Sequence, residues 1–248
     1  MKILVRVIMI FASIVMLAEA KTIEVDYKVE FGIVGEIGVA HAKLIQNDNN
    51  TYEIDIQLTA TGLAKALSGG RKERHVSKGH IENGIMVSDF YQVIKTSGSK
   101  MSNEIYRTNH KKKEVSKAKK KWKNGKKIVD ETKIVENMYA KDDLLTLYFN
   151  LNTYIKDKQT SKQYRFPAVG AEIQDGYVDI YIPKSSELPE YKKMLGSEAS
   201  WYARAIVNQD IFSSEKGELF LSIAEDGIAE KAVLKDLILF GDIRAKRL

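Results

Sequence analysis

Apolar and polar side chains alternate with a period of two along several stretches of this chain. In residues 52–59, for example, Tyr52, Ile54 and Ile56 alternate with acidic and amide side chains. This period gives a strand one buried face and one solvated face, as in antiparallel sheets. The same pattern recurs in residues 27–31, 178–182, 201–207 and 219–223. The chain is therefore predicted to be mainly β.

Turn sequences separate these stretches. Asn83-Gly84 and Asn124-Gly125 predict tight hairpins, because both residue types tolerate a positive φ. Further turns are predicted at residues 47–50, 175–176 and 226–227. Because the strands recur at short intervals without βα alternation, we expect a curved antiparallel sheet, a partly open barrel or a sandwich. No Pro- or Ser-rich linker divides the chain, so a single domain is predicted.

Helix is expected in only a small part of the chain. Asp142-Asp143 precedes an apolar segment at residues 144–151, and an Asp side chain accepts hydrogen bonds from the free amides of a first helical turn. A second short helix is predicted at residues 189–195, and a helical turn at residues 62–67. The aspartates also resemble a catalytic carboxylate pair, but helix capping accounts for them.

The first twenty residues have the layout of a secretory signal peptide. Lys2 and Arg6 precede an apolar run, and Ala18-Glu19-Ala20 offers the small residues that a signal peptidase reads. We expect cleavage after Ala20, with residues 1–20 as the signal peptide and residues 21–248 as a single exported, periplasmic β-rich domain. The alternative is an uncleaved anchor, but the apolar run is about half the roughly 20 residues of a spanning helix. No transmembrane segment is expected in the mature chain.

Charge and cysteine content narrow the chemistry. The chain has no cysteine, which excludes thiol catalysis, disulfides and cysteine-ligated zinc. The net charge is +6, and residues 111–127 hold ten lysines and one glutamate. The rest of the mature chain is therefore mildly acidic.

The lysine-rich segment is the sharpest surface feature of the sequence. As a hairpin turning at Asn124-Gly125, it would attract anionic surfaces such as lipid headgroups. Nucleic acid fits the charge but not the compartment, and is not expected as a partner. The alternative is a solvated strand pair whose lysines prevent edge-to-edge pairing. The candidate anion-binding residues are Lys111, Lys112, Lys113, Lys117, Lys119, Lys120, Lys121, Trp122, Lys123, Lys126 and Lys127.

No catalytic, cofactor-binding or metal-binding residues are predicted. The four histidines lack the spacing of metal ligands. Residues 97–100 and 116–119 match S-x-x-K, but no K-T-G follows and lysine is frequent enough for chance matches. We therefore expect no enzyme activity.

Four short motifs resemble a family of exported bacterial proteins, domain of unknown function family 3108. They are Tyr27-x-Val29-x-Phe31-Gly32-Ile33-Val34-Gly35-x-x-Gly38, Gly62-Leu63, Asp142-Asp143-Leu144-Leu145-Thr146-Leu147-Tyr148-Phe149, and Val233-Leu234-Lys235-Asp236 to Phe240-Gly241-Asp242-Ile243. The resemblance spans nearly the whole mature chain and implies a mainly β protein exported by Gram-negative bacteria. It implies no activity, and the lysine-rich segment departs from its pattern.

These observations support one leading hypothesis and two alternatives. The leading hypothesis is a soluble, non-enzymatic periplasmic protein of the cell envelope that binds an apolar or amphipathic, lipid-like ligand or an anionic envelope surface. Alternation does not distinguish a filled interior from an open groove. The first alternative is a structural or protein-interaction module of the envelope. The second, more remote one is a hydrolase of envelope polymers.

Overall fold

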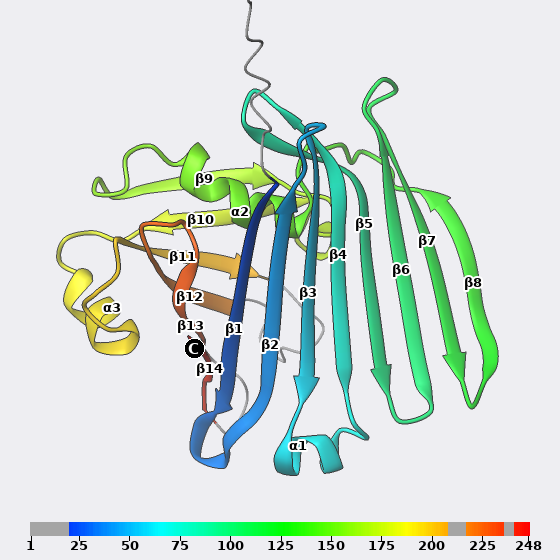
Figure 1. Ribbon diagram of the computed structural model, residues 1–248, viewed down its shortest axis with the longest axis horizontal. Helices are drawn as coiled ribbons and strands as arrows, with labels where there is room; N and C mark the ends of the chain where they lie inside the picture. Colours follow the sequence, from blue (N-terminus) through cyan, green and yellow to red (C-terminus); the bar gives the residue numbers. More distant parts are fainter. Residues whose placement is uncertain (1–19, 208–216, 236–240) are drawn as a thin grey trace, which may run out of the picture.

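The computed structural model describes residues 20–207, 217–235 and 241–248, which form fourteen strands in one antiparallel sheet (Figure 1). The strands are β1 (Lys21–Phe31), β2 (Gly35–Gln46), β3 (Thr51–Ala60), β4 (Lys72–Glu82), β5 (Ile85–Ser97), β6 (Lys100–Asn109), β7 (Glu114–Lys123), β8 (Lys126–Ile134), β9 (Lys162–Pro167), β10 (Tyr177–Ile182), β11 (Trp201–Val207), β12 (Gly217–Ile223), β13 (Ala229–Leu234) and β14 (Ile243–Arg247). The prediction of a mainly β fold is confirmed, and one continuous sheet replaces the sandwich alternative.

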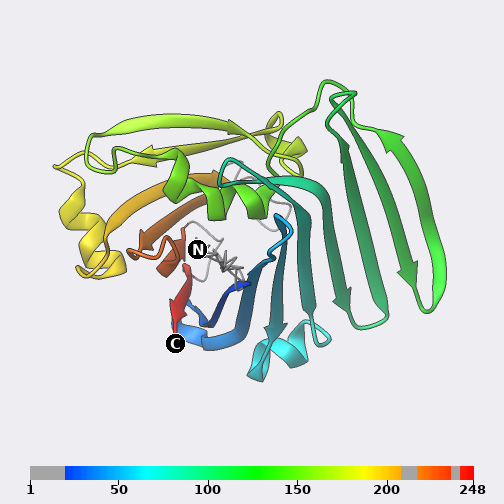
Figure 2. The ribbon, with the colours of Figure 1, turned by 45° about the horizontal axis from the view of Figure 1, so that its top comes forward.

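The strand order joins two meanders. β1 to β8 follow one another in the sheet, as do β9 to β14, and β1 pairs with β14 to connect them. In this pair Tyr27 lies opposite Arg247, and Phe31 lies opposite Ile243. Within the described residues β8 and β9 form the two ends of the sheet. The sheet curls without closing, as a partly open barrel does (Figure 2).

The predicted tight turns connect neighbouring strands. Asn83 and Gly84 have φ values of 51° and 78° between β4 and β5, and Asn124 and Gly125 have 51° and 73° between β7 and β8. Two successive positive φ values are the signature of the type I′ turn, whose twist matches that of the flanking strands. Local sequence therefore sets the register of these hairpins.

The described segments contain three short α-helices, which are α1 (Gly62–Leu67), α2 (Leu144–Tyr154) and α3 (Leu188–Leu195), and two 3₁₀ turns, which are η1 (Gly32–Val34) and η2 (Glu172–Gln174). α1 caps the connection from β3 to β4, and α3 covers the outer face of the second meander (Figure 1). Tyr191 and Leu195 of α3 pack there against Tyr202, Phe220 and Val233. No helix among the described residues has the length and apolar character needed to cross a membrane.

α2 lies inside the curl and joins the cores of both meanders (Figure 2). Leu147, Leu151 and Ile155 belong to a core cluster with side chains of β10 to β13. Leu145 belongs to a second cluster with side chains of β2 to β7. Because one short helix supplies apolar side chains to both halves, it holds the two meanders in their curled arrangement.

Candidate functional site

α2 covers only part of the concave face of the sheet. Successive side chains in a strand alternate between faces, so every second residue of β3 lies on the concave face. The exposure of these residues shows where the cover by α2 ends. Tyr52 and Ile54 are 2% and 0% exposed near α2, whereas Leu58, farther along the same strand, is 37% exposed. We call the part packed against α2 the closed end, and the part around Leu58, toward α1, the open end.

An apolar groove occupies the open end where β1 to β4 meet β13 and β14. Its volume is about 680 Å³. The apolar lining comes from Val29, Phe31, Ile37, Leu58, Leu234 and Ile243, with Arg71, Glu73 and His75 along one side. Pockets of 300–1,000 Å³ with mostly apolar walls and a few polar groups are typical of small-molecule sites.

Glu73 is the acidic residue in the wall of this groove. The Nε of Arg71 donates to its Oε1 at 2.7 Å, and the Nε2 of His75 lies 3.4 Å from its Oε2. The Nζ of Lys95 is 3.9 Å from the same oxygen. Burial opposes the charged form, but the hydrogen bond from His75 and the charges of Lys95 and Arg71 lower the pKa of Glu73 to about 2. Glu73 is therefore ionised, and its charge is balanced by its neighbours.

A second ion-pair network lies beside the first on the concave face. Glu104 accepts from the Nζ atoms of Lys117 at 3.0 Å and Lys119 at 2.8 Å. Lys117 also pairs with Glu172 at 3.2 Å, and Tyr106 donates its hydroxyl to Glu172 at 3.1 Å. Burial disfavours the Glu104 carboxylate, but the hydrogen bonds from both lysines lower its pKa to about 2.

The lysine-rich segment therefore does not form a single free basic ribbon. The predicted hairpin and its Asn124-Gly125 turn are present between β7 and β8. However, Lys117 and Lys119 point onto the concave face and pair with Glu104. Charge counting could not foresee this, because Glu104 lies outside the lysine-rich segment and meets both lysines only through the β6–β7 pairing.

The other lysines of the segment divide between several places. Residues 111–113 precede β7 in the turn at its far end. Lys120 and Lys127 reach Asp130 of β8 at 3.7 Å and 2.6 Å. Lys126 lies directly opposite Lys123 beside the hairpin turn.

Lys121, Trp122 and Lys123 contribute to a small pocket at the open end, which we call the basic pocket. Its volume is about 310 Å³, and its basic lining residues are Arg71, Lys95, Lys100, Lys121 and Lys123. Arg71 also lines the apolar groove. Arg71, Lys95 and Lys100 lie outside the lysine-rich segment in the sequence, and only the pairing of β4 to β7 brings them beside it.

The predicted aspartate cap proves to be part of a buried polar cluster. Asp143 Oδ1 accepts from the backbone amides of Leu145 and Thr146 at 2.7 and 2.9 Å, which confirms the N-cap of α2. Its Oδ2 accepts from the hydroxyls of Ser77 at 2.5 Å and Ser88 at 2.6 Å. Burial raises the pKa of Asp143 above its usual range, while these hydrogen bonds oppose the rise. Asp143 is 0% exposed, so its role is to fasten α2 to β4 and β5.

His80 and His110 both contact the carboxylate of Asp89 near the closed end. The Nδ1 of His80 is 2.9 Å from Asp89 Oδ2, and the Nε2 of His110 is 3.2 Å from Asp89 Oδ1. The hydrogen bond with Asp89 is the main reason that the pKa of His80 is raised. Three-residue clusters of His, Cys, Asp or Glu suited to a metal ion do not occur within the described part of the chain.

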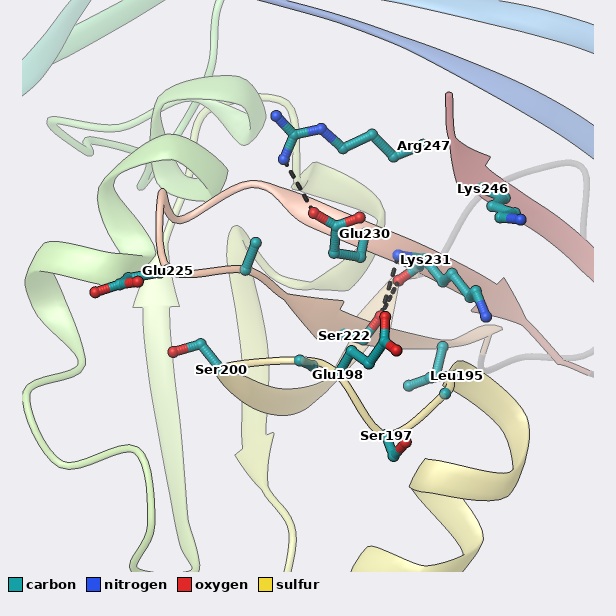
Figure 3. Close-up of a pocket in the computed structure, with 13 residues that line it drawn as sticks. Leu195, Ser197, Glu198, Ser200, Ser222, Glu225, Glu230, Lys231, Lys246 and Arg247 are labelled. Atoms are coloured by element: carbon teal, nitrogen blue, oxygen red, sulfur yellow. Dashed lines mark hydrogen bonds and ion pairs between the residues drawn. The ribbon is translucent and has the colours of Figure 1, made fainter.

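A separate polar hollow lies beside the loop that follows α3 (Figure 3). Its volume is about 730 Å³, and Glu198, Glu225 and Lys231 are among its lining residues. Glu230 is already paired with Arg247 at 3.2 Å. The hollow thus combines charges of both signs without an apolar wall comparable to that of the groove.

Comparison with known proteins identifies the fold. No known family model matches the chain, and no curated protein matches its sequence. Among solved structures, a β-barrel-like protein of the domain of unknown function DUF1849 from Brucella abortus has a TM-score of 0.52. It is 9% identical and is matched over 92% of this chain and 95% of its own. The expected resemblance to family 3108 in particular is not supported. What this chain shares with a protein of unknown function is a β-barrel-like fold.

Proposed function

We propose that this chain is an exported, non-enzymatic protein of the bacterial envelope that binds an apolar or amphipathic ligand in its apolar groove. The observation that carries this proposal is the exposure of apolar side chains inside the curl of the sheet. Leu58 and Phe31 line a groove of about 680 Å³ on the face that α2 covers elsewhere. Burying such a surface against an apolar ligand is favourable by roughly 25 cal/mol per Å².

Export is the second part of the proposal. The first twenty residues have the sequence of a signal peptide, and β1 begins at Lys21, directly after the expected cleavage point. Cleavage there leaves every strand of the sheet in the mature protein. Intact-mass measurement of the exported protein tests this step, because a chain that starts at Lys21 has a defined mass.

Native mass spectrometry of protein purified from a periplasmic extract tests the ligand. We expect an extra mass that is lost on denaturation and that passes into organic solvent. Leu58→Glu places a charge in the groove and should abolish this adduct. Ile134→Glu is a matched control, because Ile134 is 49% exposed at the end of β8 and does not line the groove. Bare masses for the wild-type protein and the control would contradict the proposal.

An interaction module is the second candidate, and the open edge of the sheet favours it. Within the described residues β8 pairs only with β7, so one side of its backbone is available to another chain. Ile128 and Ile134 are 59% and 49% exposed on this strand. Recovery of a protein partner from envelope extract, without any lipid, would favour this candidate over the ligand carrier.

A further inference from the structure

The apolar groove and the basic pocket are neighbours. Arg71 lines both, and Glu73 in the wall of the groove contacts both Arg71 and Lys95 of the basic pocket. At Arg71 the surface therefore changes from the apolar wall of the groove to the cationic wall of the basic pocket. A ligand that filled both spaces would need an apolar part and an anionic part joined to each other.

Three lysines of the basic pocket have their charges available. Lys100, Lys121 and Lys123 make no ion pair with any residue that the structure describes. Acidic residues are likewise missing from the pocket's described lining. By contrast, Lys117 and Lys119 on the same strand as Lys121 both pair with Glu104. Among the β7 lysines on the concave face, the two without an ion pair to a described residue, Lys121 and Lys123, therefore both lie at the pocket.

The register of the strands brings these charges together. Lys100 lies directly opposite Lys123, and Lys123 lies directly opposite Lys126 on the next strand. Like charges in directly opposite positions destabilise a sheet. A bound anion would remove this repulsion, whereas a neutral ligand would leave it in place.

We infer that the ligand of the apolar groove is a phosphate-bearing amphiphile whose head binds in the basic pocket. This inference rests on the proposed function, because it assigns the chemistry of the ligand at the same site. A phosphate monoester carries close to two negative charges near pH 7, which three lysines match better than the single charge of a carboxylate. Lysine ammonium groups bind phosphate as point charges.

Calorimetric titration with three probes tests the inference. Decyl phosphate carries both the chain and the head, decyl glucoside carries the chain with a neutral head, and inorganic phosphate is the head alone. We expect decyl phosphate to bind at least about 10-fold more tightly than either of the other two. The difference between the two amphiphiles should shrink at high salt, because exposed charges are screened.

A triple variant and a matched control assign the effect to the pocket. Lys100→Gln, Lys121→Gln and Lys123→Gln together should weaken decyl phosphate by about 10-fold and leave decyl glucoside unchanged. The same variant without ligand should be no less stable than wild type, because like charges have been removed. Lys184→Gln, Lys192→Gln and Lys193→Gln make the same change of charge on and before α3, away from both spaces, and should bind as wild type does.

Each of the other possible outcomes would contradict a specific part of the inference or the proposed function. Equal binding of both amphiphiles by wild type, unaffected by the triple variant, would overturn the phosphate head while leaving the groove as a ligand site. Inorganic phosphate binding as tightly as decyl phosphate would show that pocket and groove do not share one ligand. If neither amphiphile binds, the proposed function fails together with the inference.

Discussion

The two ends of the concave face share strand β3, but α2 covers that strand at only one of them. At the closed end Ile54 is 0% exposed beneath α2, and at the open end Leu58 is 37% exposed on the same face of the same strand. The apolar alternation is equally regular at both positions. Alternation therefore specifies which side chains face inward, whereas the placement of a single helix decides which of them are covered.

The two ends also hold their acidic side chains differently. Asp143 at the closed end is surrounded by hydroxyl and amide donors, and burial raises its pKa. Glu73 on β4, toward the open end, and Glu104 on β6 are held by cations, and the pKa of each falls to about 2. At the closed end a carboxylate thus holds a helix in place. The open end combines ion-paired carboxylates with lysines that have no acidic partner among the described residues.

Replacing Asp143, the carboxylate that holds α2 in place, should change the free energy of unfolding more than any other substitution at either end. Asp143→Ala removes the helix cap and leaves the hydroxyls of Ser77 and Ser88 without their acceptor in a buried site. We expect the free energy of unfolding to fall by about 3–5 kcal/mol, from the loss of a cap and of several buried hydrogen bonds. Urea denaturation measures this change.

Asp130→Ala provides the control, because Asp130 pairs with Lys120 and Lys127 in an exposed strand. Its cost should stay below about 1 kcal/mol. A cost below that level for Asp143→Ala would mean that α2 is held by apolar packing alone, and that the polar cluster is dispensable.

Two truncations on one strand compare the packing at the two ends directly. Ile54→Ala removes a fully buried side chain and should cost about 3 kcal/mol. Leu58→Ala removes an exposed one and should cost less than about 1 kcal/mol. Equal costs in urea denaturation would show that Leu58 is covered in solution, and the open groove would have to be abandoned.

Much of the fold could be predicted from the sequence because the determining signals are local. The period of two in β3, the turn at Asn124-Gly125 and the cap of α2 are each set by neighbouring residues. The pairing of β1 with β14 could not be predicted, because Tyr27 and Arg247 are separated by nearly the whole length of the chain. Without that pairing, one continuous curled sheet is not distinguishable from a sandwich.

The candidate site could be predicted only in part for the same reason. Lys121 and Lys123 stand out in a dense run of charge, but Arg71, Lys95 and Lys100 are ordinary surface cations until the register is known. Conversely, the local density of lysine predicts free charge at Lys117 and Lys119, whereas both lysines are paired with Glu104. The acidic partner of these lysines lies on another strand, so it cannot be seen in a local composition.

A pH dependence of stability with opposite signs is predicted for two further variants. Burial raises the pKa of Asp142, next to the α2 cap, to about 6. The folded state then holds a proton that the unfolded state releases near pH 4, so this group costs stability as pH rises from about 4 to 6. Asp142→Asn removes that cost and should gain stability relative to wild type across this range.

Glu104→Gln should behave in the reverse way. The pKa of Glu104 is lowered to about 2, so its carboxylate stabilises the fold above about pH 4.5 and loses that effect as the pH falls toward 2. The variant should match wild type near pH 2 and fall below it as the pH rises. Each slope is bounded at about 1.4 kcal/mol per pH unit and is measured by urea denaturation across the pH series. Parallel curves for the two variants would mean that the two acids do not differ in how the fold holds them. Divergence would show that burial beside α2 and pairing with lysines shift the pKa values of these two acids in opposite directions.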